Sequence, residues 1–333
     1  MNSTNSPLLT IVIPTRDRPD WLELCLRSIF ECQRTIPDVI VSDNSSATHQ
    51  QMDVLRRKYS FHYIRQTGHM SMVDHHNACL RLPSTQWMML LHDDDELYPD
   101  SLSRVEPFLA DSKDIGIVVG GLQHIDPQGT VHWEWLPDWS YLNNTGFREE
   151  DGLLRLGLGF DARSPNTIFD VAKGRHIGGF LEIDGTGADY TFFCQLAYSY
   201  GVAFLPDRMG RYRRGHEQGS DLSIPDNVTK NVRASAQKAE LLRSIGCSAA
   251  AVDQLVDNNT WAFFVWVAPQ WLDSDPAFVF ELCQKCLLLS PHRGAWQFRA
   301  RKEYPLLFWQ PQWLARLLFV MLHRSGCLIK RRG

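Results

Sequence analysis

The chain has 333 residues, of which 44% are hydrophobic and 22% are charged, and its formal net charge at pH 7 is −4. This composition is typical of a globular protein with a sizeable core, and it excludes general nucleic-acid binding, which needs a basic face for the phosphates. No apolar stretch reaches the roughly 20 residues that span a bilayer, and the polar N-terminus lacks the features of a signal peptide. We therefore expect a cytoplasmic protein with reduced cysteines.

Strand-like and helix-like segments alternate through the first half of the chain, which predicts a mainly parallel sheet flanked by helices. Pro19 is expected to open the first helix, because its missing N–H would have no partner in a first turn. A second helix is predicted over 73–82. The predicted strands cover residues 8–13, 38–42, 61–65, 87–91 and 115–119.

The sequence pattern of the second half of the chain changes twice, near residue 121 and near residue 226. Residues 121–175 show no clear period and are interpreted as loops and short strands over a binding face. A helix over 188–200 and a strand over 202–205 follow. Helical patterns then predominate, which predicts an α/β domain over 1–225 and a helical region over 226–333. The later helices are predicted near residues 229–245, 249–267, 277–289 and 312–323.

Three consecutive carboxylates, Asp93 to Asp95, follow the apolar segment Trp87–Leu91. Clustered negative charges repel one another, and a hard divalent cation such as Mg²⁺ or Mn²⁺ compensates that cost because it prefers oxygen ligands. Ligands also bind at the carboxyl ends of strands in an open α/β sheet. The alternative is a solvated acidic turn that opens the helix beginning near Pro99.

Asp43 ends the second predicted strand, in the segment VIVSDNSS. In a parallel sheet its carboxylate would lie at the same edge as Asp93 and Asp94, where it could accept the N–H of a uracil-like base. Taken alone, this segment fits a turn built by Asp, Asn and Ser at least as well.

Together these pieces resemble the family 2 glycosyltransferases, which have the GT-A fold and transfer sugars with inversion. The resemblance covers about the first 220 residues, in the order TIVIPTRDRPDWLELCLRSI, VIVSDNSS, NACLRLPSTQWMMLLHDDDELYPDSL, GTGADYTFFCQLA and VAFLPDRMGRYRRGHEQGS. It implies a hexosyltransferase-type enzyme of glycan biosynthesis that uses a nucleotide-sugar donor, most simply a UDP-sugar, and Mg²⁺ or Mn²⁺.

The resemblance assigns residues to the donor site one by one. Asp94 matches the carboxylate that ligates the metal in the family's Asp-x-Asp motif, and Asp93 is expected to meet ribose or metal-bound water. The segment beside the nucleotide base is Pro14, Thr15, Arg16 and Asp17, together with Asp43. Arg16, Ser42, Asn44 and His92 depart from the family pattern, which leaves the nucleotide less certain than the reaction class.

Asp189, at the start of a predicted helix, matches the family's general base. A carboxylate at a helix N-terminus is stabilised as the anion, and the alternative role is a plain helix cap. Arg213 and Arg214 are expected to neutralise the leaving phosphates. His216 resembles a late histidine that approaches the metal in some relatives, although an ordinary loop position fits it equally well.

Residues 311–333 combine an apolar face with basic residues and no acidic ones. This pattern fits an interfacial helix that lies on the inner face of an anionic cell membrane. It fits equally a helix packed on the catalytic domain. The acceptor is expected to be a saccharide or a lipid-linked saccharide. Two alternatives stay open: a non-catalytic binder of nucleotide-sugars or glycans, and a nucleotidyltransferase, against which the glycine-free segment 14–19 argues.

Overall fold

The computed structural model describes residues 7–47, 50–111, 114–137, 162–182, 188–214 and 275–289, and parts of the stretch 236–260. The chain divides into two compact units. The first comprises Met1–Glu182 and Gly187–Gln218, and the second comprises Ile183–Thr186 and Gly219–Gly333. The predicted boundary near residue 225 stays a prediction.

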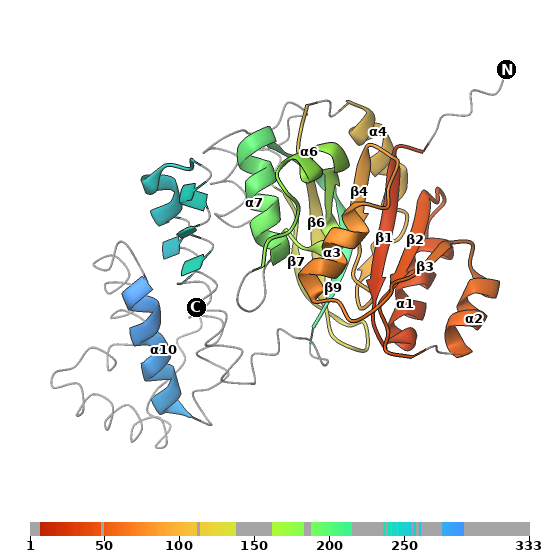
Figure 1. Ribbon diagram of the computed structural model, residues 1–333, viewed down its shortest axis with the longest axis horizontal. Helices are drawn as coiled ribbons and strands as arrows, with labels where there is room; N and C mark the ends of the chain where they lie inside the picture. Colours follow the sequence, from red (N-terminus) through yellow and green to blue (C-terminus); the bar gives the residue numbers. More distant parts are fainter. Residues whose placement is uncertain are drawn as a thin grey trace. The chain divides into compact units, whose positions relative to one another are not determined.

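A nine-stranded mixed sheet forms the centre of the first unit (Figure 1). Its strands are β1 (Leu9–Thr15), β2 (Asp38–Asp43), β3 (His62–Arg65), β4 (Trp87–Leu90), β5 (Glu96–Leu97), β6 (Ile117–Ile125), β7 (Val131–Trp135), β8 (Thr167–Asp170) and β9 (Val202–Arg213). The strand order is β3-β2-β1-β4-β8-β6-β9-β5, and β7 pairs with β6 beside this path.

Strand direction divides the sheet into two parts. β3, β2, β1 and β4 pair parallel with one another, and β9 is parallel to β6. β8 pairs antiparallel with β4 and β6, β7 with β6, and β5 with β9. All seven residues of β1 are buried, as expected for a central strand covered on both faces. The predicted α/β sheet is confirmed, with antiparallel pairs that the sequence did not predict.

Helices flank this sheet, and α3, α6 and α7 lie in contact along one row (Figure 1). Pro19 begins the first helix as predicted, and this helix buries Leu22, Cys25, Leu26 and Ile29. The helices of this unit are α1 (Pro19–Phe30), α2 (Gln50–Lys58), α3 (Met72–Leu80), α4 (Leu102–Asp111), α6 (Val171–His176) and α7 (Ala188–Tyr200), with the 3₁₀ turn η2 (Ser164–Asn166). The sequence predicted neither α2 nor α6.

One close approach of two backbones fixes η2 against β9. A Cβ added to Gly210 would lie 2.1 Å from the carbonyl oxygen of Pro165, so only glycine fits at this position. Asn166 strengthens the same junction by donating from Nδ2 to the carbonyl of Gly120 at 2.7 Å. The turn η2 is therefore held between β6 and β9.

In the second unit the described residues include α10 (Pro276–Leu289), which confirms the helix predicted over 277–289. Cys283 and Cys286 are buried free thiols on this helix, as expected for core cysteines. The predicted helix 312–323 and the whole segment 311–333 lie outside the described residues. Among the described helices, none combines the length and the apolar character that crossing a membrane requires.

Candidate active site

Polar side chains gather where β1, β2 and β4 end. The strands are in register, with Thr15 opposite Asp43, and the backbone N–H of Asn44 donates to the carbonyl of Thr15 at 3.0 Å. On the other side of β1, the N–H of Leu91 donates to Val12 at 3.0 Å. The segments that follow these strands therefore share one edge of the sheet, as the sequence predicted from parallel pairing.

The acid cluster, defined as Asp93, Asp94 and Asp95, is buried at this edge, with exposed fractions of 0%, 6% and 1%. Thr15 Oγ1 donates to Asp93 Oδ2 at 2.7 Å. Arg18 contacts two of the carboxylates, with Nη2 2.7 Å from Asp93 Oδ1 and Nη1 3.0 Å from Asp94 Oδ2. Sequence reasoning missed Arg18, which lies just beyond the segment that the family resemblance assigned.

Burial of the acid cluster is only partly compensated by the positive charge beside it. It raises the pKa of Asp93 to about 7, because the Asp94 charge adds to the cost of burial while Arg18 and Thr15 only partly offset it. Burial also raises the pKa of Asp95 well above its usual range, and the charges of Asp94 and Asp93 add to that effect. A bound cation would remove this cost.

His92, Asp94 and Asp95 offer ligand atoms that all lie within 4.8 Å of one another. Among the described residues, no hydrogen-bond partner reaches the buried atoms His92 Nε2 and Asp95 Oδ2. Carboxylate oxygens and an imidazole nitrogen form a donor set that suits Mn²⁺. These residues therefore fit a divalent cation. The predicted ligand Asp94 is among them, whereas His216 lies outside the described residues.

Two contacts fix the position of His92. Its backbone N–H donates to Ser164 Oγ of η2 at 2.7 Å. Its ring stacks on the buried ring of His76 from α3, with centroids 5.2 Å apart and an interplanar angle of 26°. Burial lowers the pKa of His76 well below its usual value, and the neighbouring His92 and His75 lower it further, so His76 is neutral.

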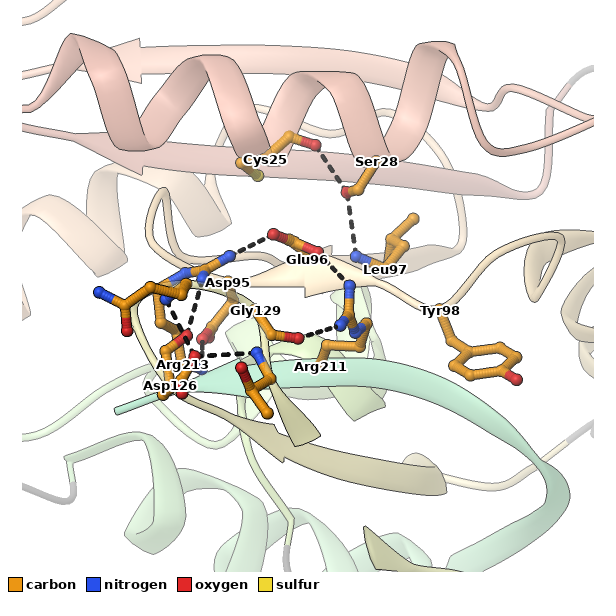
Figure 2. A network of polar contacts seen from close by, with 12 residues as sticks. Cys25, Ser28, Asp95, Glu96, Leu97, Tyr98, Asp126, Gly129, Arg211 and Arg213 are labelled. Atoms are coloured by element: carbon orange, nitrogen blue, oxygen red, sulfur yellow. Dashed lines mark hydrogen bonds and ion pairs between the residues drawn. The ribbon is translucent and has the colours of Figure 1, made fainter. Parts of the chain in front are cut away.

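Arg213 supports the acid cluster from β9 (Figure 2). It is 1% exposed, and its backbone N–H donates to Asp95 Oδ1 at 3.0 Å. Its guanidinium donates to the carbonyls of Asp94, Asp126 and Pro127 and to the carboxylate of Glu96. These contacts favour a role in positioning the acid cluster over direct contact with phosphates.

The β2 side of the edge carries a further buried carboxylate, Asp43. Its Oδ1 accepts the N–H of Ser45 at 2.8 Å, and its Oδ2 accepts from Tyr63 at 2.7 Å and from Arg65 at 2.8 Å. Burial alone would raise the pKa of Asp43, but these hydrogen bonds outweigh it and hold the pKa below its usual value. Asp43 is therefore an oriented anion.

Asp17 joins the loops that follow β1 and β2. Its N–H donates to Ser45 Oγ at 2.8 Å, its Oδ1 accepts the N–H of Ser46 at 2.9 Å, and its backbone has φ of 55°. Arg16 lies beside it, with a side chain 45% exposed. Pro14 lies within β1 opposite Ser42. The predicted base-side residues Pro14 to Asp17 thus lie next to Asp43 across the β1–β2 pair.

Asp189 lies in the first turn of α7, as predicted. The pKa of the nearby Tyr212 phenol in β9 is affected by the charge of Asp189. The pKa of Tyr212 is raised to about 12, mainly by burial; the charges of Asp95 and Asp189 contribute to this rise, and those of Arg163 and Arg214 oppose it. Asp189 and the acid cluster therefore act electrostatically on the same side chain.

Comparison with known proteins agrees with the predicted family and fold. Residues 10–171 match the family model described as "Glycosyl transferase family 2", which confirms the resemblance found in the sequence. This match includes the acid cluster, Asp43 and Arg18, and it ends before Asp189 and Arg213. A search of curated proteins finds no match.

Solved structures of glycosyltransferases have a similar fold. The crystal structure of S. aureus TarS 1–349 in complex with UDP-GlcNAc is 15% identical with a TM-score of 0.65, covering 96% of this chain and 92% of that one. The mannosyltransferase PcManGT from Pyrobaculum calidifontis in complex with GDP-Man and Mn²⁺ is 13% identical with a TM-score of 0.54, covering 99% and 89%. At these identities the likeness shows the fold, and the GT-A prediction is confirmed.

Proposed function

We propose that this chain, whose residues 10–171 match the family model "Glycosyl transferase family 2", transfers a hexosyl group from a nucleotide-sugar to a saccharide acceptor with inversion. The observation that carries this proposal is the buried acid cluster at the carboxyl ends of the parallel strands, next to the oriented carboxylate of Asp43. Buried carboxylates of this density are costly unless a charged ligand compensates them.

The donor would lie along the edge from β2 to β4. In this proposal Asp43 would accept an N–H from the base and Asp93 a ribose hydroxyl, while Arg16 and Asp17 would border the base. A uracil ring has the N–H that Asp43 needs, so we favour a UDP-sugar. The complexes of TarS with UDP-GlcNAc and UDP, and of PcManGT with GDP-Man, support a nucleoside-diphosphate donor.

Asp94, with Asp95 and His92, would hold a Mg²⁺ or Mn²⁺ ion. A divalent ion held there would neutralise the charge of the donor diphosphate. Mn²⁺ in the PcManGT complex supports this choice of ion. Arg18 holds Asp93 and Asp94 together from the β1 side, and Arg213 holds the backbone of Asp94 and the carboxylate of Asp95 from the β9 side.

Asp189 would act as the general base. It accepts the proton of an acceptor hydroxyl while that oxygen attacks the anomeric carbon, and the bond from this carbon to the diphosphate oxygen breaks on the opposite face. The nucleoside diphosphate leaves with the bonding electron pair, and the configuration inverts. Asp189 lies in the first turn of α7, the place at which the family resemblance puts the general base.

The acceptor would be a growing glycan or a lipid-linked saccharide. We keep the proposal that residues 311–333 contact an anionic membrane, which would put the enzyme at the inner face of the membrane in the cytoplasm. His216 as a further metal ligand, and Arg214 as a partner of the leaving phosphates, belong to the same proposal. The division into a catalytic domain over 1–225 and a helical region over 226–333 does too.

The test is release of the nucleoside diphosphate from a panel of nucleotide-sugars, with and without Mn²⁺, and anomeric analysis of the product by NMR. We expect metal-dependent release and an inverted anomeric centre. Donor binding without hydrolysis or transfer would instead support the non-catalytic binder, which the departures at Arg16, Ser42 and His92 favour. A retained configuration would refute inversion alone.

A further inference from the structure

Four rings from four segments of the first unit form a continuous series, called here the aromatic column: His92 after β4, His76 in α3, Phe180 after α6 and Phe192 in α7. His92 stacks on His76. The rings of His76 and Phe180 meet at 66° with centroids 5.3 Å apart, and Phe180 stacks on Phe192 at 4.1 Å and 24°. His76, Phe180 and Phe192 are buried, with exposed fractions of 4%, 2% and 1%. Because a close-packed interior transmits displacement, a shift of one ring moves its neighbours.

Asn77 on α3 fixes the backbone of Phe180 with both ends of its side-chain amide. Its Nδ2 donates to the carbonyl of Phe180 at 2.8 Å, and its Oδ1 accepts the N–H of Phe180 at 2.8 Å. This pair of hydrogen bonds is called the Asn77 clamp. The approach requires glycine at position 179, where φ is 78° and a Cβ would lie 2.4 Å from Asn77 Oδ1. Phe180 is therefore fixed by its backbone as well as by the packing of its ring.

The two ends of the aromatic column lie beside the two groups to which the proposed function gives separate roles. At one end, His92 is a proposed ligand of the cation. At the other end, Phe192 follows Asp189 by three residues, so the two side chains lie on the same side of α7 in adjoining turns. Since α3 contacts α6 and α6 contacts α7, the column crosses a row of three helices (Figure 1).

We propose that the aromatic column positions Asp189 relative to the cation site, and that Phe180, held by the Asn77 clamp, is a positioning residue for the transfer step. This inference rests on the proposed function and adds residues that touch neither substrate nor cation. A base displaced by about 1 Å transfers protons far more slowly, whereas the proposed donor contacts do not include Asp189. Phe180 therefore acts on kcat. His76, which also contacts His92, acts on kcat and on cation binding.

Phe180→Leu tests the base end of the aromatic column, because it removes the ring on which Phe192 stacks. We expect kcat to fall roughly ten- to hundred-fold, while the donor KM and the Kd for Mn²⁺ change by less than about twofold. The matched control is Phe30→Leu on α1, which breaks another stacked pair, with Tyr59 at 5.3 Å and 22°. It should lower the Tm and leave kcat unchanged.

A second comparison places Phe180→Leu in an Asp189→Asn background. If Phe180 acts through Asp189, no base is left to displace, and kcat should fall by less than about twofold further. An equal fall in both backgrounds would overturn the positioning role. Asn77→Ala, which keeps all four rings, should lower kcat as Phe180→Leu does, and it replaces Phe180→Leu if that variant fails to fold. The effects of Asn77→Ala and Phe180→Leu should not add, and additive effects would separate the clamp from the column.

The cation end of the aromatic column is tested without any measurement of turnover. Electron spin echo modulation of bound Mn²⁺ detects coupling to the ¹⁴N nucleus of a coordinated imidazole. We expect this coupling in the unaltered protein, its weakening in His76→Leu, and its return in His76→Phe, which keeps an aromatic ring against His92. Phe30→Leu should leave the coupling unchanged. Full coupling in His76→Leu would overturn the cation end of the column.

Two results separate this inference from the proposed function. A large loss of kcat in Asp189→Asn together with normal kcat in Phe180→Leu and Asn77→Ala would contradict the positioning role and leave the proposed function standing. Near-normal turnover in Asp189→Asn would contradict the proposed base and, with it, the base end of the aromatic column. The ¹⁴N coupling in His76→Leu would then still decide whether the column positions His92.

Discussion

Arg18 Nη2 lies 2.7 Å from the Oδ1 atom of Asp93, a carboxylate with no exposed surface. The same guanidinium reaches Asp94, so a side chain from the turn after β1 supplies positive charge to the acid cluster that follows β4. This pairing links the two segments from which the donor site is proposed to form.

Arg18→Ala should lower the free energy of unfolding by about 1–3 kcal/mol, because it leaves a buried carboxylate without its charged partner. Mn²⁺ binding should become tighter in this variant, since a competing positive charge is gone. Urea unfolding and Mn²⁺ titration measure the two effects. Arg34→Ala is the matched control: Arg34 pairs with Asp100 but is 80% exposed, so less than about 1 kcal/mol should be lost.

Removal of the proposed metal ligands should weaken cation binding. We expect Asp94→Asn, Asp95→Asn and His92→Ala each to raise the Kd for Mn²⁺ by about tenfold or more, measured by electron paramagnetic resonance. Asp53→Asn on α2, whose side chain is 57% exposed, should leave the Kd unchanged. Unaltered binding in His92→Ala would remove the imidazole from the ligand set while leaving the carboxylates.

Asp189→Asn should lower kcat by roughly 10²–10⁴-fold and leave the donor Kd almost unchanged, because the amide cannot accept the acceptor proton. Steady-state transfer kinetics and calorimetric donor binding separate the two quantities. Asp207→Asn, whose side chain is 38% exposed and pairs with Arg104, serves as the control. A variant with near-normal turnover would show that another group is the base.

Asp43→Asn should destabilise the fold in a pH-dependent manner. The folded-state pKa of Asp43 is lowered, so its contribution is present above the unfolded pKa of about 3.9 and is lost as pH falls through the folded value. At pH 7 we expect a loss of about 1–3 kcal/mol, which should shrink below about pH 4. Chemical unfolding from pH 3 to 8 measures it, and the exposed Asp38 at the start of β2 provides the control through Asp38→Asn.

Arg213→Met should destabilise the first unit by about 3–5 kcal/mol, because it removes a charged donor from the Glu96 carboxylate and from the carbonyl groups of Asp94, Asp126 and Pro127. Arg213→Lys should restore little of this, since an ammonium cannot span the same acceptors. Circular dichroism on heating measures both variants. If Arg213→Met kept its stability and lost only donor affinity, contact with the phosphates would be the better assignment.

The parallel half of the sheet and its acidic edge could be predicted from the sequence, because apolar strands followed by polar residues are a local signal. Asp43, Asp93 and Asp94 were found in this way. The antiparallel pairing of β8, β7 and β5 joins segments far apart in the chain, and no local pattern specifies such partners. Arg18 was given no role from the sequence, and His92 was noted only as a departure from the family pattern, because their contacts with the acid cluster depend on side-chain direction.

Arg213 shows a different limit of sequence reasoning. A run of two arginines near the end of a strand suggests exposed side chains available for phosphates, yet Arg213 is 1% exposed and has acceptors on several loops. Burial of a charged residue depends on tertiary packing, here on the turn at Asp126 and on Trp21, whose ring lies 5.2 Å from the guanidinium. The sequence alone carries no sign of either contact.

Gly210 affects which residues of this protein can be substituted without moving the candidate site. The turn η2 rests directly on the backbone of β9 at this glycine, and Ser164 of the same turn fixes the backbone of His92. The spacing between the imidazole and the strand that carries Arg213 is thus set by main-chain contact, which is insensitive to the exchange of one apolar side chain for another. Core residues could therefore diverge widely while the ligand geometry persists, whereas a single methyl group at position 210 would disturb it.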